Sequence, residues 1–278
     1  MAQNRVDFFV VGAQRCGTTF LSNALAGLEA VEFCSVKEPF FFTQAEDWRE
    51  SIGEYHDLFC FDEDAINGEG STHYTMIPKY KPVYRDIYEY NPEAKIIYSI
   101  RDPVERAVSL FTYYHGGRTS DTQLTETIEH NIEYLCAGMY YRQIAPYIEQ
   151  FGWENVHIVV FEDMVARPTE VIQQAAGFLG TDEVPAEIHD DETNASEENY
   201  APSNSVSQFL YQLYGHSGIH RYIPDSLIEV GKQHVLQTSQ KPDPSASLKM
   251  KLTEFFEEDI RGVEKLLDRN LQHWRHPE

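Results

Sequence analysis

Three short apolar runs mark the strands that this sequence predicts. They cover residues 6–11 (VDFFVV), 95–100 (KIIYSI) and 156–161 (VHIVVF), and they are rich in β-branched and aromatic side chains. Runs of this length and composition are typical of strands that are buried on both faces of a parallel sheet. A further strand is expected to end shortly before His73, which lies in the segment GEGSTHY.

A helical pattern follows each of the three runs. Residues 18–26 carry Leu and Ala at helical spacing, Val104, Val108 and Phe111 share one helical face, and the segment 171–180 closes with Gly180. Strands that alternate with helices predict an α/β fold. We expect a three-layer sandwich in which helices flank a central parallel sheet.

Two further segments differ in character. Residues 181–204 are rich in Asp, Glu, Asn, Ser and Pro and have almost no apolar periodicity, which predicts an acidic surface loop or lid. Residues 248–271 keep apolar side chains at helical spacing and predict an amphipathic helix packed on the core. With no internal repeat and no strong boundary, residues 1–278 are expected to form a single domain.

Charge narrows the range of partners. The 278 residues include 22 Lys and Arg against 45 Asp and Glu, a formal net charge of −23. Such acidity disfavours duplex nucleic acid and anionic membrane surfaces. The first apolar run is too short for a signal peptide and is interrupted by Asp7, and no later run reaches bilayer length. We expect a cytoplasmic protein without a membrane span. The sequence does not indicate its oligomeric state.

Cysteine usage gives little support to a disulfide framework or a structural zinc site. The four cysteines stand far apart, with no CxxC pair and no His at zinc-finger spacing. They are Cys16, Cys34, Cys60 and Cys136. A reducing compartment and the absence of a metal site are the expectations.

The segment 12–19 (GAQRCGTT) lies where an anion-binding loop belongs, between a buried strand and a helix N-terminus. Backbone N–H groups and the helix dipole can hold an anion there. The spacing is nearly that of the P-loop GxxxxGK[ST], but Thr18 occupies the Lys position and Arg15 lies inside the loop instead. The segment predicts a P-loop-like fold, although a tight strand-to-helix connection alone would look similar.

The order of the motifs adds specificity. GAQRCGTTFL from Gly12 is followed by KEPFFF from Lys37, YSIRDPVERAVSLF from Tyr98, FGWENVHIVVFEDMVARP from Phe151 and FLG from Phe178. This set resembles the sulfotransferases that use 3′-phosphoadenosine 5′-phosphosulfate (PAPS), in particular the heparan sulfate sulfotransferases and their bacterial relatives. The resemblance covers most of residues 1–180. It implies PAPS as donor, 3′-phosphoadenosine 5′-phosphate as product, and no metal.

On the donor side, the resemblance implies two groups of residues. Those of the loop would bind the 5′-phosphosulfate: Arg15, Cys16, Gly17, Thr18 and Thr19. Arg101 and Ser109 match the pair that holds the 3′-phosphate. Arg15 stands where the family more often has Lys, and it would oppose the charge that develops on the bridging oxygen. Arg106 could contact the nucleotide or belong to local ion pairs.

On the acceptor side, the resemblance implies that Glu38 is the catalytic base for in-line attack by a hydroxyl or amine. An exposed Glu ahead of a core strand is the plainer interpretation. His73 falls where relatives place acceptor-site or catalytic residues, or it has a structural loop role. The acceptor is expected to be a carbohydrate or small molecule, and the acidic chain favours a small neutral or cationic one.

Two other functions are compatible with the sequence. A P-loop kinase acting on a small molecule would need Mg²⁺ and a Walker Lys, against which Thr18 argues. A non-catalytic nucleotide-binding scaffold would not need Glu38.

The sulfotransferases that this sequence resembles usually have a basic segment late in the chain that closes over the nucleotide. For this segment the chain offers only scattered candidates: Arg221, Lys232 and Lys241.

Overall fold

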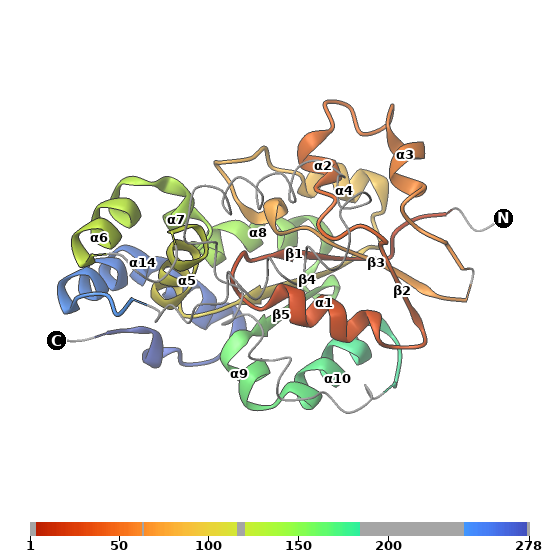
Figure 1. Ribbon diagram of the computed structural model, residues 1–278. Helices are drawn as coiled ribbons and strands as arrows, with labels where there is room; N and C mark the ends of the chain where they lie inside the picture. The colour runs from red at the N-terminus through yellow and green to blue at the C-terminus, as the bar shows by residue number, and fades with distance from the viewer. Residues whose placement is uncertain (1–3, 63, 116–119, 184–241, 277–278) are drawn as a thin grey trace, which may run out of the picture.

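A five-stranded parallel sheet forms the centre of the computed structural model, which describes residues 4–62, 64–115, 120–183 and 242–276 (Figure 1). The strand order is β2-β3-β1-β4-β5, and every neighbouring pair is parallel. The strands are β1 (Phe8–Gly12), β2 (Val31–Phe33), β3 (Ile66–Gly70), β4 (Lys95–Ile100) and β5 (Val156–Val160). The predicted α/β sandwich with a central parallel sheet is confirmed.

Strand β1 lies in the middle of the sheet and is buried along its whole length. Its side chains alternate between two hydrophobic cores, as the pleat of a strand requires. Phe8 and Val10 belong to one core, whereas Phe9 and Val11 belong to the other. Both faces of the sheet must therefore be covered by helices.

Helices α1 (Thr18–Ala26), α9 (Phe161–Ala166) and α10 (Pro168–Leu179) cover the face that holds Phe8 and Val10 (Figure 1). Helix α10 begins with Pro at its first position and ends at Gly180, whose φ of 104° is left-handed. Proline at the start and glycine just past the end are common boundary signals. They account for the bounds of this helix.

The larger core lies on the opposite face, under α4 (Tyr84–Tyr90), α5 (Pro103–His115), α8 (Tyr140–Phe151) and α14 (Ala246–Leu267). Short helices complete the described part of the chain. They are α2 (Phe41–Gln44), α3 (Ile52–His56), α6 (Asp121–His130), α7 (Ile132–Cys136) and the 3₁₀ turns η1 (Thr72–Thr75), η2 (Trp153–Asn155) and η4 (Gln272–Trp274).

The structure differs from the sequence-based boundaries in several places. Strand β1 covers Phe8–Gly12 instead of residues 6–11, and α14 begins at Ala246 instead of residue 248. Phe161 begins α9 instead of ending the strand, and α14 stops at Leu267 because Asp268 is left-handed, with φ of 46°. Strand β2 was not anticipated, since three residues are too few to show a period. Of the predicted acidic loop 181–204, residues 184–204 lie outside the described residues.

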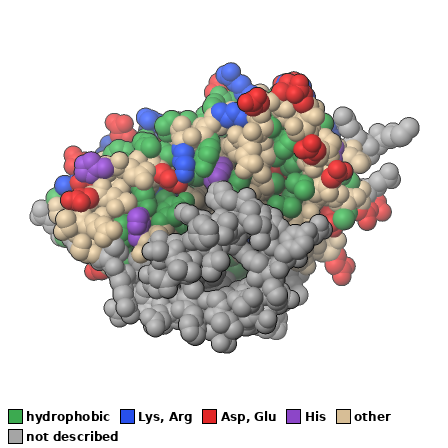
Figure 2. Space-filling view, turned by 45° about the horizontal axis from the view of Figure 1, so that its top comes forward, with side chains coloured by type: hydrophobic (Ala, Val, Ile, Leu, Met, Phe, Trp, Pro, Cys, Tyr) green, Lys and Arg blue, Asp and Glu red, His purple; other side chains and the backbone are tan. Residues whose placement is uncertain are grey.

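On the face shown in Figure 2, the described Lys and Arg side chains lie singly among acidic and hydrophobic ones. They form no continuous basic patch on that part of the surface. Within the described ranges, no helix has the length and apolar character needed to cross a bilayer.

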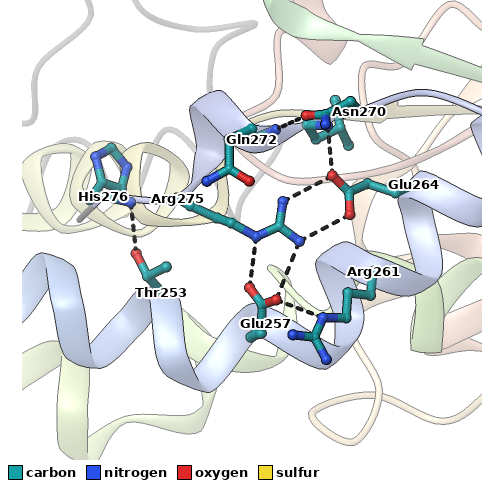
Figure 3. A network of polar contacts seen from close by, with 9 residues as sticks. Thr253, Glu257, Arg261, Glu264, Asn270, Gln272, Arg275 and His276 are labelled. Carbon is teal, nitrogen blue, oxygen red and sulfur yellow. Dashed lines mark hydrogen bonds and ion pairs between the residues drawn. The ribbon is translucent and has the colours of Figure 1, made fainter.

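The C-terminal segment is packed into the larger core. Leu271 and Trp274 are fully buried, and the Trp274 ring meets the Tyr140 ring edge-on with centroids 6.0 Å apart. Next to it, Arg275 lies between Glu257 and Glu264 of α14 and forms ion pairs of 2.9 Å with each (Figure 3). This segment is therefore held by buried apolar contacts and by charge.

Replacement of Gly68 in β3 by alanine can test how tightly the side chains pack against the sheet. A Cβ at Gly68 would lie 2.1 Å from the fully buried Phe8 ring, so Gly68→Ala should cost about 1–3 kcal/mol of unfolding free energy through overpacking. Urea denaturation measures this. Gly177→Ala in α10 is the matched control, because a Cβ there meets nothing within 4 Å. It should be neutral or stabilise by about 0.4–1 kcal/mol, and equal loss in both variants would contradict the packing described.

Candidate functional site

The sequence-predicted site residues gather where the parallel strands end. The loop after β1 carries Arg15, the segment after β2 carries Glu38, η1 after β3 carries His73, and Arg101 follows β4 directly. In open α/β sheets, ligands bind outside the carboxyl ends of the strands. The fold thus places all four segments at the edge where a ligand site is expected.

Backbone contacts with β4 fix the loop after β1. The Ala13 N–H donates to the Ser99 carbonyl at 2.7 Å, and the Ser99 hydroxyl donates to the Cys16 carbonyl at 2.6 Å. Arg15, between them, has a left-handed φ of 69°. A non-glycine residue in this region is uncommon and needs support from its surroundings.

Gly17 allows the loop to enter α1. Its φ is 78°, and a Cβ there would lie 2.4 Å from Met164 Cε and 2.8 Å from the Phe161 ring, so only glycine fits. Within the described residues, no side-chain hydrogen bond caps α1 at Gly17, and the first turn of α1 contains no acidic residue. The first N–H groups of α1 can therefore receive an anion.

Arg15 and Ser109 meet although they are far apart in sequence. The Arg15 Nε–H donates to Ser109 Oγ at 3.2 Å, and the Arg15 guanidinium lies 4.8 Å from the centroid of the Tyr113 ring. Ser109 and Tyr113 are one turn apart on α5. Ser109 and Tyr113, on one face of α5, thus orient the Arg15 guanidinium of the loop after β1.

Arg101 lies at the junction of β4 and α5. Its guanidinium lies 4.5 Å from the centroid of the Phe161 ring and 4.0 Å from Glu105, and its side chain is 15% exposed. Asp102 Oδ1 accepts hydrogen bonds from the N–H groups of Val104 and Glu105 at 2.9 and 3.2 Å, which caps α5. The RDP motif therefore combines a largely buried cation with a helix cap.

Arg106 belongs to the core. It is fully buried, and its Nη2 donates to the Tyr134 carbonyl, while Nε and Nη1 have no hydrogen-bond partner among the described residues. The ligand contact that the sequence left open for Arg106 is not supported by this position.

Glu38 occupies a strained turn. Its φ is 51° and that of Phe40 is 53°, both left-handed. Thr72 Oγ1 donates to Glu38 Oε2 at 3.1 Å. Burial raises the pKa of Glu38, opposed by the Lys37 charge, the Thr72 hydrogen bond and the Arg15 charge. Of these opposing effects, the Arg15 charge is the smallest.

His73 is held between two aromatic rings. The Phe40 ring is stacked on it with centroids 3.6 Å apart, and the Tyr80 ring lies 4.1 Å away on a near-parallel plane. His73 Nε2 is 3.4 Å from the Tyr80 hydroxyl. The imidazole is half-buried, so the stack fixes its orientation beside the Glu38 turn.

The Cys16 thiol points into the core. It is fully buried, its Sγ lies 3.7 Å from the Tyr140 hydroxyl, and burial raises its pKa to about 11. The thiol does not line the loop. Any contact of Cys16 with a ligand would come from its backbone.

The C-terminal segment reaches the edge of the site. His276 Nε2 lies 2.9 Å from Asp102 Oδ2, and the Asp102 N–H donates to Glu162 Oε1 at 2.9 Å. Nearby, Arg269 pairs with Asp163. The basic candidates Arg221, Lys232 and Lys241 lie outside the described residues.

Several contacts at the site were not anticipated from the sequence. The residues that make these contacts lie within or close to a motif. None of them belongs to a sequence pattern that would have pointed to its contact. They are Thr72 beside His73, Ser99 before the RDP motif, Tyr113 one helical turn after Ser109, and Phe161 at the end of the apolar run 156–161. Among the residues that the structure describes, no three His, Cys, Asp or Glu side chains are grouped to hold a metal.

Comparison with known proteins agrees with this arrangement. The sulfotransferase domain family matches residues 5–212, well over half of the chain, so the chain belongs to this family. The resemblance noted from the ordered motifs is confirmed.

Similarity to individual proteins is lower. Carbohydrate sulfotransferase 15 of Mus musculus is 24% identical over an alignment of 169 positions, and the match covers 45% of this chain and 30% of that protein. The 3-alpha-hydroxysteroid sulfotransferase of Cavia porcellus is 24% identical over 103 residues, which are 35% of each chain. The chain thus matches about a third of the length of these curated relatives.

A solved structure shares the fold. The crystal structure of a sulfotransferase from Alicyclobacillus acidocaldarius aligns with a TM-score of 0.67 at 23% identity, covering 98% of this chain and 100% of that one. The P-loop-like α/β architecture expected from the sequence is therefore the fold of a sulfotransferase.

Thiol labelling tests the position of Cys16. Of the four free cysteines, only Cys60 is exposed, and Cys16 has a buried thiol with a pKa of about 11. Because the thiolate is the reactive form, the native protein should show one fast-reacting thiol at pH 7.5 and four after unfolding. Cys60→Ser should abolish the fast phase. A fast phase that persists in Cys60→Ser and is lost in Cys16→Ser would place the Cys16 thiol in the open loop.

Proposed function

We propose that this protein transfers a sulfuryl group from PAPS to a hydroxyl or amine of a small-molecule or carbohydrate acceptor. One observation carries the proposal: Arg15, in the loop that leads into α1, and Glu38, in the segment after β2, both follow carboxyl ends of the parallel strands, and the Arg15 charge lowers the pKa of Glu38. A base and a cation at an anion-binding helix end are the groups that this reaction needs.

The donor would bind along α1 and α5. The N–H groups of Gly17, Thr18 and Thr19 are suited to the 5′-phosphosulfate because the helix end is uncapped by side chains of the described residues. Arg101 and Ser109 are suited to the 3′-phosphate, which distinguishes this nucleotide from ADP. Cys16 would contribute through its backbone alone.

In the proposed step, the acceptor oxygen or nitrogen attacks sulfur in line with the bridging oxygen. A bond from the acceptor to sulfur forms, and the bond from sulfur to the bridging oxygen breaks. The electron pair stays on the 5′-phosphate of the leaving nucleotide, where Arg15 opposes the new charge. Glu38 Oε takes the acceptor proton. Transfer of the sulfuryl group in this way needs no metal ligand from the protein.

His73 would lie on the acceptor side, next to the base. The support for this role is its stacking on Phe40, two residues from Glu38. The net charge of −23 favours a small neutral or cationic acceptor over a polyanionic glycan. We further propose that residues 1–278 act as one domain in the cytoplasm.

Calorimetry can test the donor site directly. The protein should bind 3′-phosphoadenosine 5′-phosphate more tightly than ADP or AMP, and Arg101→Ala should weaken that binding roughly 10-fold or more because a charge-assisted hydrogen bond is lost. Arg261→Ala, an exposed cation of α14, is the control and should bind normally. Tighter binding of ADP in the presence of Mg²⁺ would favour the kinase function instead.

Replacement of Glu38 separates chemistry from binding. Glu38→Gln should lower kcat about 10²-fold or more and leave the affinity for 3′-phosphoadenosine 5′-phosphate unchanged. The wild-type kcat should fall as the pH drops through the pKa of Glu38, because the ionised form is the base. Since burial raises that pKa, the fall should begin above the usual range of a Glu carboxyl.

The exposed Glu50→Gln is the control for this substitution and should keep full kcat. Full activity of Glu38→Gln would remove the base assignment. Tight nucleotide binding by the wild type, with no acceptor sulfated in a broad panel, would favour the non-catalytic scaffold.

A further inference from the structure

A second acidic side chain, Glu69 of β3, is joined to the segment after Glu38 through Tyr74, whose hydroxyl contacts both Glu69 and the Phe42 N–H. It is fully buried, and its Oε2 accepts hydrogen bonds from the hydroxyl groups of Tyr55 and Tyr74, the latter at 3.2 Å. Buried carboxyl groups are costly unless they are hydrogen-bonded, and they are rare without a role. The mechanism proposed above does not use Glu69.

The residues that follow Glu69 hold the Glu38 turn at three points. The Phe40 N–H donates to Ser71 Oγ at 3.0 Å, and the Phe42 N–H donates to the Tyr74 hydroxyl at 3.3 Å. Thr72 Oγ1 donates to the Glu38 carboxylate itself. The segment 69–74 therefore acts as the support of the segment 38–42.

This support is needed because the turn is strained. Neither Glu38 nor Phe40 is glycine, yet both have left-handed φ values, of 51° and 53°. Such conformations persist only where surrounding contacts over-determine them. Loss of one contact should let the turn relax and carry the Glu38 carboxylate away from its place.

Glu69 controls the direction of one of these contacts. A tyrosine hydroxyl has one hydrogen to donate. Because Tyr74 donates that hydrogen to Glu69, its oxygen lone pairs are left to accept the Phe42 N–H. Without an acceptor at position 69, the hydroxyl hydrogen must turn to another acceptor, and the oxygen lone pairs are no longer fixed in the direction of the Phe42 N–H.

We propose that Glu69 is a positioning residue for the transfer reaction: its carboxyl orients the Tyr74 hydroxyl, which holds the 38–42 turn so that Glu38 faces the acceptor. The proposal rests on the proposed function, since it takes Glu38 as the base. It requires an acceptor oxygen at position 69 and no negative charge there. Burial raises the pKa of Glu69 to about 7, so the carboxyl is neutral below that pH, and an amide is a fair replacement.

Two variants of Glu69 test the requirement for an acceptor. Glu69→Met keeps the approximate size of the side chain and removes both oxygens, whereas Glu69→Gln keeps one acceptor oxygen. We expect Glu69→Met to lower kcat about 10-fold or more, with the KM for PAPS and the Kd for 3′-phosphoadenosine 5′-phosphate changed less than about twofold. Glu69→Gln should restore kcat to within about threefold of wild type.

A control variant separates positioning from general loss of stability. Tyr90→Phe removes a hydroxyl from the same aromatic core, where it accepts the Val6 N–H at 2.8 Å, and it has no hydrogen bond to the 38–42 turn. It should lower the melting temperature and leave kcat unchanged. If Glu69→Met does not fold, Tyr74→Phe removes the linking hydroxyl alone and should give the same fall in kcat.

The outcomes distinguish this inference from the proposed function. Normal kcat in Glu69→Met or Tyr74→Phe, with Glu38→Gln inactive, would overturn the role of Glu69 and leave the base assignment in place. Equal loss of kcat and nucleotide affinity, or a fall in kcat in Tyr90→Phe that matches its loss of stability, would make Glu69 merely structural. Full activity of Glu38→Gln would instead overturn the proposed function.

Discussion

Strand β1 is hydrogen-bonded along both edges and buried on both faces, and the rest of the molecule depends on this placement. Its neighbours β3 and β4 run parallel to it, so their carboxyl ends meet at one edge. Helices must cover both faces, which leaves that edge as the place where loops can carry polar side chains. The loop that carries Arg15, the Glu38 turn and Arg101 all follow from this one constraint.

The chemistry of the site is carried by strained backbone. Arg15 and Glu38 both have left-handed φ values, and each is held by residues of a neighbouring segment: Ser109 for the cation, Thr72 for the carboxylate. The free energy of the strain is offset by packing of the surrounding sheet and helices.

The sequence predicted the parts of the fold that have a strong period or a strong boundary. The strands 95–100 and 156–161, helix α1 and the end of α10 at Gly180 agree with the structure to within a residue, because burial on both faces and glycine leave clear signals. Strand β2 was too short to be seen. At the site, motif residues could be named in advance, but Thr72, Tyr113 and Glu69 could not, since their contacts join segments that are distant in sequence.

The burial of Trp274 has a consequence for synthesis of the protein. A ribosome delivers the N-terminal strands first, and domains generally fold as they emerge. Here, the core around Tyr140 is open until Leu271 and Trp274 arrive, and the Asp102 cap acquires its His276 partner at the same late moment. The apolar surface around Tyr140 is therefore covered only when this last segment has left the ribosome.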